Sequence, residues 1–259
     1  MKSKKLKKWT TLLTCATALT VMTACSQSSS QSTGTTSSTT SKTSAVTATT
    51  SKKTNKNNNS NSNYFTSKDS DTSYNESSAT KIKLSGSSAD VSGDGAALSG
   101  STVTISKAGT YVISGKSDGV QIKVDAGDSD DVHIVLDGAT MTNTNAAINA
   151  TKAGHVYLTL KDGTTNTLSD SSSNSDEDAD AVIFSKGDLT INGTGTLNID
   201  AKKNNGIKAN DSLHITGGTY KISSVGDAFN VNDELNITGT TMTIEAEEDA
   251  VKVDNDDDT

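Results

Sequence analysis

The chain has no proline and no arginine, and aromatic residues are only 3% of its 259 residues. The absence of arginine excludes an arginine general base, and the scarcity of large apolar side chains means that not all of the chain belongs to one core. Both cysteines, Cys15 and Cys25, lie near the N-terminus, so the body of the chain has no disulfide. An exported domain without disulfides needs another source of stability, either a long repetitive core or metal ions.

The first 25 residues predict an export signal. Lysines crowd its start, and the apolar stretch from Leu12 to Met22 is too short to span a bilayer as a stable helix. It ends in Met22-Thr23-Ala24-Cys25, which resembles the lipobox of bacterial lipoproteins, with methionine in place of the usual leucine. We therefore expect a lipid on Cys25 and an exported protein anchored to the extracellular face of the cell membrane. The alternative is an ordinary cleaved signal peptide with an incidental cysteine.

Residues 26–79 are mostly Ser, Thr, Asn, Gln and Lys. This stretch lacks the apolar side chains whose burial offsets the entropy of ordering a chain. We therefore expect a flexible, disordered tether over residues 26–79 and a folded domain over residues 80–259.

A unit of about 22 residues repeats at the C-terminal end of the chain. Each unit holds three apolar pairs of the form apolar-x-apolar, and a glycine-containing turn separates the first pair from the second. Alternation with period two indicates strands with one face inward. Three short strands per unit, with no helix between them, predict an all-β fold: a single-stranded parallel β-helix with three strands and about 22 residues per coil. The pairs are Leu189/Ile191, Leu197/Ile199 and Ile207/Ala209, then Leu213/Ile215, Tyr220/Ile222 and Phe229/Val231, then Leu235/Ile237, Met242/Ile244 and Val251/Val253.

Earlier segments follow this pattern less regularly, as expected for coils near the end of a solenoid. The stretch from Ser169 to Asp178, rich in Ser, Asp and Glu, predicts an insertion that projects from one coil. The chain stops at Thr259 at the end of a coil, and an uncapped β-helix end exposes unpaired backbone groups. We therefore expect the domain to be incomplete at its C-terminal end, or covered there by a partner.

The net charge of −8 is unevenly placed, because residues 188–259 hold 14 acidic residues and five lysines. An acidic surface argues against nucleic acid as a partner. It also argues against direct binding of a polyanion, unless cations bridge the two surfaces.

Acidic and amide side chains recur at two corners of the predicted coils. Neighbouring coils lie about 4.8 Å apart, and two carboxylates about 5 Å apart repel by roughly 3 kcal/mol at an effective dielectric of 20. Dense oxygen donors suit Ca²⁺, so we expect calcium at these corners. The alternative is a ladder whose side chains satisfy the N–H groups of the turns. The candidate ligands are Asn205, Asp227 and Asp249 at one corner, and Asp211, Asp233 and Asp254 at the next.

Outward-facing side chains are the candidates for ligand binding. Tyr157 lies between Val156 and Leu158 and should point outward, where a sugar ring could stack on it. Lys208 and Lys252 point outward from the third strand of their coils, and either would replace an arginine base only if its pKa were lowered.

The histidines and three other aromatic residues are not expected to bind a ligand. His133, His155 and His214 alternate out of their strands with no paired His or Cys nearby, so we expect them to face solvent rather than to bind metal. Phe184 and Phe229 are expected to point inward, as is Tyr220.

The region from about residue 80 to 259 resembles a family of bacterial surface proteins described as carbohydrate-binding domain-containing proteins. The resemblance rests on the Gly-Thr-Tyr-x-x-x-Gly segment at 109–115, the Leu-x-Ile-x-Gly strands and the Asp-Ala-Phe/Val-x-Val corners. It implies a right-handed parallel β-helix similar to pectate lyases, binding of polysaccharides that include acidic, uronate-containing ones, and calcium on the helix. We therefore expect a non-catalytic polysaccharide-binding lipoprotein. The alternatives are a polysaccharide lyase on the same fold, and a surface stalk or adhesin without affinity for sugar.

Overall fold

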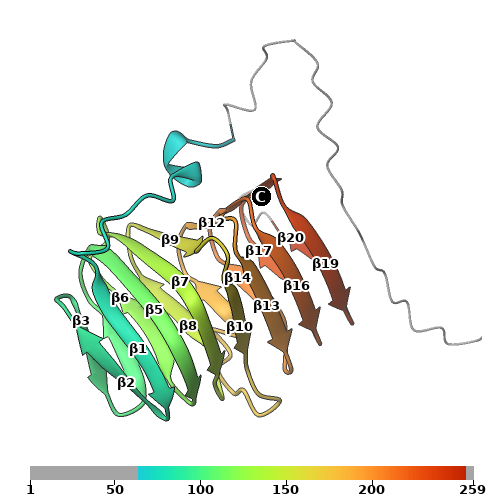
Figure 1. The fold of residues 1–259 in the computed structure, drawn as a ribbon. Coiled ribbons are helices and arrows are strands. Elements are labelled where there is room, and N and C mark those ends of the chain that lie inside the picture. The colour runs from blue at the N-terminus through green and yellow to red at the C-terminus, as the bar shows by residue number, and fades with distance from the viewer. Residues whose placement is uncertain (1–63, 255–259) are drawn as a thin grey trace, which may run out of the picture. The chain divides into compact units, whose positions relative to one another are not determined.

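The computed structural model describes residues 64–254 of the chain, so the predicted export signal and Cys25 lie outside the described residues. The described part contains β-strands and one short 3₁₀ helix, η1 (Ser67–Ser70), with no α-helix (Figure 1). None of its helices is long and apolar enough to cross a membrane. The prediction of an all-β fold is confirmed for this part of the chain.

Each C-terminal repeat folds into one coil of three strands, and each strand pairs in parallel with its counterpart in the next coil. Leu189, Leu213 and Leu235 therefore lie side by side at the start of successive coils. This is the pairing expected of a β-helix with three strands per coil. The strands are β12 (Leu189–Gly193), β13 (Thr196–Ala201) and β14 (Asn205–Ala209), then β15 (Leu213–Thr216), β16 (Thr219–Ser224) and β17 (Phe229–Val231), then β18 (Leu235–Thr238), β19 (Thr241–Ala246) and β20 (Val251–Val253).

The preceding coils continue the same stacks with longer strands. β7 runs through the bend between two faces, pairing with β9 along its first half and with β10 along its second. Its partner β5 makes the same bend at Gly115, where φ is +88° and a Cβ would lie 2.5 Å from the carbonyl oxygen of Leu84. The strands are β4 (Thr102–Ile105), β5 (Gly109–Asp118), β6 (Gln121–Asp125), β7 (Asp131–Thr142), β8 (Ile148–Lys152), β9 (His155–Leu160), β10 (Thr165–Ser169) and β11 (Ala181–Ser185).

The two ends of the stack differ. At the N-terminal end, β2 (Ser88–Ser92) pairs antiparallel with β1 (Thr80–Gly86), and β3 (Ala96–Ser99) pairs antiparallel with β4, so both sheets end on a reversed strand. At the other end of the described residues, β18, β19 and β20 are edge strands. Val251 and Val253 there are 47% and 43% exposed.

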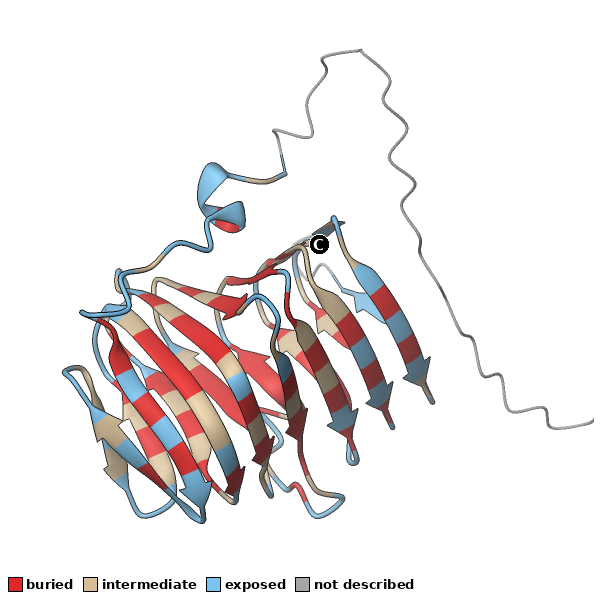
Figure 2. Cartoon of the chain, viewed as in Figure 1, coloured by how far each residue is buried: buried red, intermediate tan, exposed pale blue. Residues whose placement is uncertain are grey.

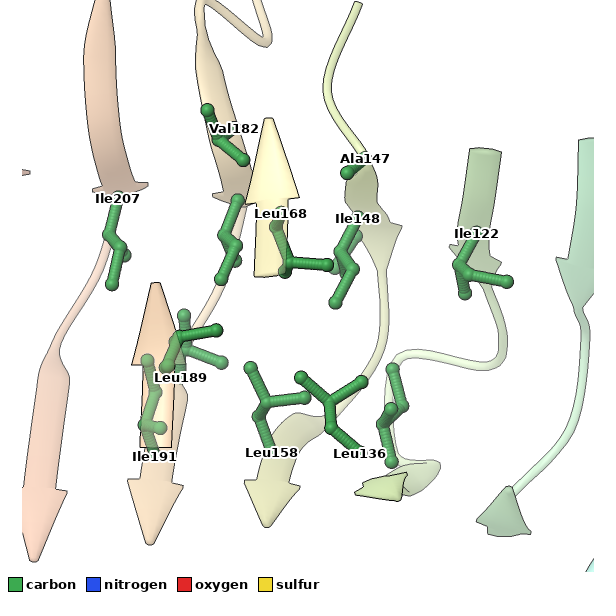
Figure 3. Packing of buried hydrophobic residues seen from close by; sticks show 14 of the residues in the cluster. Ile122, Leu136, Ala147, Ile148, Leu158, Leu168, Val182, Leu189, Ile191 and Ile207 are labelled. Carbon is green, nitrogen blue, oxygen red and sulfur yellow. The ribbon is translucent and has the colours of Figure 1, made fainter. Parts of the chain in front are cut away.

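One continuous apolar core fills the inside of the coils. In most strands buried residues alternate with more exposed ones (Figure 2), and Leu158 of β9 lies beside Ile191 of β12 in the core (Figure 3). Stacked aliphatic side chains of this kind replace the aromatic residues that the composition lacks. Tyr220 and Phe229 belong to this core, as predicted.

The expectation for Phe184 was wrong. Its Cα pairs with Lys208 of the next coil, whose side chain points outward, and Phe184 packs in a separate small cluster with Ala146 and Ala179. The predicted insertion ends next to Ala179, so this segment buries the outward ring of Phe184. Strand β11 thus has apolar residues on both of its faces, which hides the period-two pattern.

The boundary of the folded part also differs from the one expected. Residues 64–79, which we call the arm, were assigned to the tether, yet they lie across the outer side of the larger sheet before β1 begins (Figure 1). Tyr74 and Ala79 of the arm pack with Val112 of β5 and Val135 of β7. The polar composition concealed this docking, because the arm is held mainly by hydrogen bonds, as described below.

Candidate functional site

Asn205, Asp227 and Asp249 stack at one corner, as the repeat predicts, but they form a hydrogen-bonded ladder. The N–H of Asp227 donates to Asn205 Oδ1 (3.0 Å), and the N–H of Asp249 donates to Asp227 Oδ1 (3.1 Å). The second carboxylate oxygen of Asp227 accepts from Asn230 Nδ2 (2.8 Å). Asp227 is only 3% exposed. Both of its oxygens therefore accept hydrogen bonds from the protein itself, as the alternative of a ladder predicts.

The next corner keeps free carboxylates. Burial, together with the charges of Asp188 and Asp233, raises the pKa of Asp211. In the described residues neither Asp211 nor Asp233 forms an ion pair, whereas Asp254 pairs with Lys252 (3.0 Å). Across residues 64–254, no three His, Cys, Asp or Glu side chains converge closely enough to hold a metal ion. The corner thus concentrates negative charge without enclosing a site.

The two predicted ligand-binding lysines are engaged in ion pairs. Lys208 Nζ lies 2.7 Å from Asp180 Oδ1, and Asn204 Nδ2 donates to the other oxygen of Asp180 (2.6 Å). Lys208 therefore anchors the chain that follows the insertion. Lys252 lies on the edge strand β20 beside Asp254, and the pair raises its pKa, which is opposite to what a general base needs.

Tyr157 points outward from β9, as predicted, but its ring is covered. It stacks on His155, with the ring centroids 4.1 Å apart and the planes at 14°. Lys68 of the arm places its ammonium group 4.6 Å from the centroid of the Tyr157 ring, in cation–π geometry, and also pairs with Asp131. We call the outer side of the first half of β7 and of β9, β12 and β15 the arm face.

The three histidines lie on the arm face, and the expectation that they face solvent was wrong. His133 Nε2 lies 2.7 Å from Thr159 Oγ1, and His155 Nε2 lies 2.9 Å from Thr190 Oγ1. Burial lowers the pKa of both histidines. The third, His214, packs edge-on against Phe65 of the arm. Sequence reasoning placed these rings outward correctly and missed the segment that covers them.

We call the outer side of β10, β13, β16 and β19 the open face, and no segment within residues 64–254 covers it. Residues at every second position align across the four strands into three polar rows. A shallow groove of about 450 Å³ lies over the second and third of these rows. The rows are Thr165, Thr196, Thr219 and Thr241; Thr167, Asn198, Lys221 and Thr243; and Ser169, Asp200, Ser223 and Glu245.

The open face was not singled out from the sequence, although its signal was present. The outward residues of the second strand in each repeat are threonines at equivalent positions and a set of amide and charged residues beside them. Because neighbouring strands lie about 4.8 Å apart, a chain laid across them meets a hydrogen-bonding side chain at every strand. Lys221 is the cation at the centre of this array, with Asn198 and Thr243 on either side of it.

Comparisons with known proteins agree with this architecture. The profile of the carbohydrate-binding domain-containing protein family matches residues 99–259. A protein of that description from Acetivibrio thermocellus is 37% identical over 137 residues, which are 51% of this chain and 48% of the relative. The chain thus spans about half the length of this curated relative. A solved structure described as a polysaccharide lyase-like protein from C. thermocellum, a gadolinium derivative, aligns with a TM-score of 0.58 and 26% identity over 68% of this chain and 95% of that chain.

Proposed function

Because the chain belongs to the family of carbohydrate-binding domain-containing proteins, we propose that it binds a polysaccharide along the open face, without catalysis. The observation that carries the proposal is the groove of aligned hydroxyl, amide and charged side chains, which lies within the residues matched by the family. Hydroxyl and amide groups both donate and accept hydrogen bonds, as the hydroxyls of a sugar do. The coils that present this face are proposed to wind as a right-handed β-helix.

The charges of the open face favour a neutral glycan. Lys221 is flanked in the neighbouring row by Asp200 and Glu245, and all three are exposed. A polyanion would meet two carboxylates for each ammonium group, whereas a neutral chain would meet only hydrogen-bonding groups. The ammonium and the carboxylates would then bind sugar hydroxyls through charge-assisted hydrogen bonds.

Replacement of Lys221 and Asn198 by Ala tests the proposal. We expect the double variant to bind polysaccharide at least about tenfold more weakly, equivalent to about 1.4 kcal/mol, and to unfold like the parent because both side chains lie outside the core. Pull-down and calorimetry with the polysaccharides that the parent retains are the measurement. Lys83→Ala, an exposed lysine on β1, is the matched control. Parent-like binding by the double variant would reject the open face as the site, and a parent that retains no glycan would favour the stalk or adhesin function.

A polysaccharide lyase is the second candidate, and the description of the structural neighbour is what favours it. The chain has no arginine to act as the base, and the two lysines considered for that role, Lys208 and Lys252, are held in ion pairs. Incubation with polygalacturonate and calcium separates the two functions. Rising ultraviolet absorbance from unsaturated products would establish catalysis and overturn the binding-only proposal.

The proposal also includes a lipid on Cys25 that anchors the exported protein to the membrane. Replacement of Cys25 by Ser should move the protein from the membrane fraction to the soluble fraction. Unchanged fractionation of the variant would contradict the anchor. The lipid anchor is proposed from the sequence around Cys25, which lies outside the described residues.

Calcium at the acidic corners remains a prediction, and at the second corner its candidate ligands Asp211 and Asp233 form no ion pair in the described residues. These two carboxylates repel each other. An ion bound only by the folded protein would stabilise it by about 2.7 kcal/mol at 100 times its Kd. The melting temperature should then fall in chelator and recover with calcium, and the Asp211→Asn, Asp233→Asn variant should lose this response. Identical melting in calcium and chelator would rule the ion out.

A further inference from the structure

The arm inserts a carboxylate into a pocket of the arm face. Asp69 is 2% exposed, and it is the one buried residue between positions 64 and 78. Its Oδ1 accepts a hydrogen bond from Thr190 Oγ1 (2.7 Å) and lies 3.3 Å from His214 Nδ1. Its Oδ2 accepts from the N–H and the hydroxyl of Thr66 (2.7 and 2.8 Å). A buried carboxylate is stable only with such partners, and two of them, Thr190 and His214, belong to the sheet and form the pocket that receives Asp69.

Two hydrogen-bond relays of the sheet point at the arm. The hydroxyl of Thr190 donates to Asp69, so it must accept from the Nε2–H of His155. The second relay runs from His133 to the Thr159 hydroxyl and on to Asn192 Oδ1 (2.7 and 2.5 Å). The Nδ2 group of Asn192 then donates to the carbonyl oxygens of Asp69 and Asp71 (3.2 and 3.1 Å). Both relays end in donors aimed outward, which suits a ligand rich in oxygen acceptors.

An aromatic platform lies beside this pocket. The stacked rings of Tyr157 and His155 present one flat surface, and Lys68 rests on it one residue before Asp69. His155 is common to both features, because its ring stacks on Tyr157 while its Nε2 bonds to Thr190. A ligand that reaches both features combines a flat ring-sized body with a carboxylate, and a hexuronate sugar has this combination.

The arm is attached by few groups. Apart from Asp69, its side chains from 64 to 78 are exposed or half-buried, and it forms no strand pairing with the sheet between these positions. The carboxylate of Asp69 and the backbone carbonyl oxygens of Asp69 and Asp71 accept hydrogen bonds from the sheet. The other main attachments are the contacts of Lys68 and the packing of the Phe65 and Tyr74 rings on histidines of the sheet. A segment held in this way opens at a free energy far below that of global unfolding.

We propose that the arm face is a second glycan-binding face, selective for carboxylate-bearing sugars, and that the arm is its built-in competitor. Asp69 stands where the carboxylate of a hexuronate would bind, and Lys68 covers the ring on which the sugar would stack. The inference rests on the proposed carbohydrate function but concerns a different face and a different class of sugar. Acidic glycan binds when the arm leaves, and the open face binds neutral glycan whether or not the arm is docked.

Competition by the arm sets the size of the expected effect. The apparent affinity of a ligand is reduced by the fraction of molecules in the competent state. If the arm is docked in about nine molecules of ten, releasing it tightens binding of an acidic glycan about tenfold. Binding of a neutral glycan at the open face does not change.

Asp69→Ala tests the proposal, with Asp90→Ala, an exposed acid on β2, as the matched control. Hydrogen exchange of residues 64–75 reports release of the arm, and calorimetry reports affinity for galacturonate and galactose tetramers. We expect faster exchange and about tenfold tighter binding of the galacturonate tetramer by Asp69→Ala, with no change for the galactose tetramer. Adding Thr190→Val should remove the gain, because the pocket then lacks its donor.

Two results would overturn the role of the arm: unchanged hydrogen exchange of residues 64–75 in Asp69→Ala, or unchanged affinity for the galacturonate tetramer once the arm is released. Two others would overturn the selectivity: an equal gain in affinity for the galactose tetramer, or stronger competition for the arm face by an aspartate-rich peptide than by galacturonate. The proposed function fails separately. A Lys221→Ala protein that binds galactose tetramer like the parent rejects the open face and leaves the Asp69 comparison unaffected.

Discussion

The arm face and the open face are two sides of one bent sheet, and β7 joins them, since its first half pairs with β9 and its second half with β10. On the arm face, rings, hydroxyls and a carboxylate are enclosed and satisfy one another. On the open face, residues of similar polarity, such as Asn198 and Lys221, have no segment of the described part of the chain above them. The difference shows that the inward pattern of a coil determines the fold, whereas its outward residues acquire their chemistry from whatever lies over them.

The largest expected effect comes from the ladder of Asn205, Asp227 and Asp249, at the corner between the second and third strands of the coils. Asp227→Ala leaves the N–H of Asp249 and the amide of Asn230 without their acceptor in two part-buried hydrogen bonds, and each such loss costs about 1–3 kcal/mol. We expect the free energy of unfolding, measured in urea, to fall by about 2–4 kcal/mol. Asp227→Asn keeps Oδ1 as an acceptor and should cost less. Similar losses for Asp227→Ala and for Asp233→Ala, which makes no such bonds, would contradict the ladder.

One substitution made on both faces sharpens the comparison. Thr190→Val removes a buried hydroxyl that links His155 to Asp69, which should weaken docking of the arm by about 1–3 kcal/mol. Thr243→Val removes an exposed hydroxyl of the open face and should change the free energy of unfolding by less than about 0.5 kcal/mol. Hydrogen exchange of residues 64–75 and urea unfolding measure the two effects. Equal exchange in both variants would mean that the relay does not hold the arm.

The smallest expected effect is a pH dependence confined to the arm face. Burial lowers the pKa of His133 and His155 while the arm is docked, and release should return both to about 6.5. The released state then binds more protons, so docking weakens as pH falls below about 6.5. Exchange of residues 64–75 should therefore be faster at pH 5.5 than at pH 7.5, after correction for the intrinsic rate.

Several charged groups near these histidines also affect their pKa values, so the pH experiment needs controls for them. Asp71 and Lys68 act on His133, and Asp188, Asp69, Asp131 and His214 act on His155. The pKa of Asp69 is lowered, since hydrogen bonds from Thr190 and Thr66 outweigh its burial, so its own titration lies below this window. A His133→Gln, His155→Gln protein should lose the response, and His214→Gln measures the contribution of the third ring. A response that persists in the double variant would assign the effect elsewhere.

Much of the fold could be read from the repeat. The apolar pairs predicted the strands β12 to β20, their alternation and their stacking, because period-two burial leaves one register in which all pairs face inward. The same logic placed Tyr157 outward and Tyr220 inward. It failed at Phe184, where the insertion covers the outer face of β11 and supplies a second apolar environment.

The candidate site was less predictable. Nothing near Asp69 in the sequence indicates burial, and its partner Thr190 lies 121 positions away. For Asp227, the sequence allowed either a calcium ligand or a ladder, and the hydrogen bonds of the ladder, from Asp249 and Asn230, became visible only in the structure. An aspartate at this position looks the same in the sequence in both cases, because the sequence does not show where the neighbouring N–H groups point.

The sequence by itself determined the coils, since the alternation of side chains and the glycine turns are local properties that are present in each repeat separately. Only the tertiary structure decided which outer face is covered and which is open. That choice depends on hydrogen bonds between the arm and side chains contributed by strands from separate coils, each weak alone and far apart along the chain. Such bonds form only after the coils have stacked and brought His155, Thr190 and His214 onto one surface.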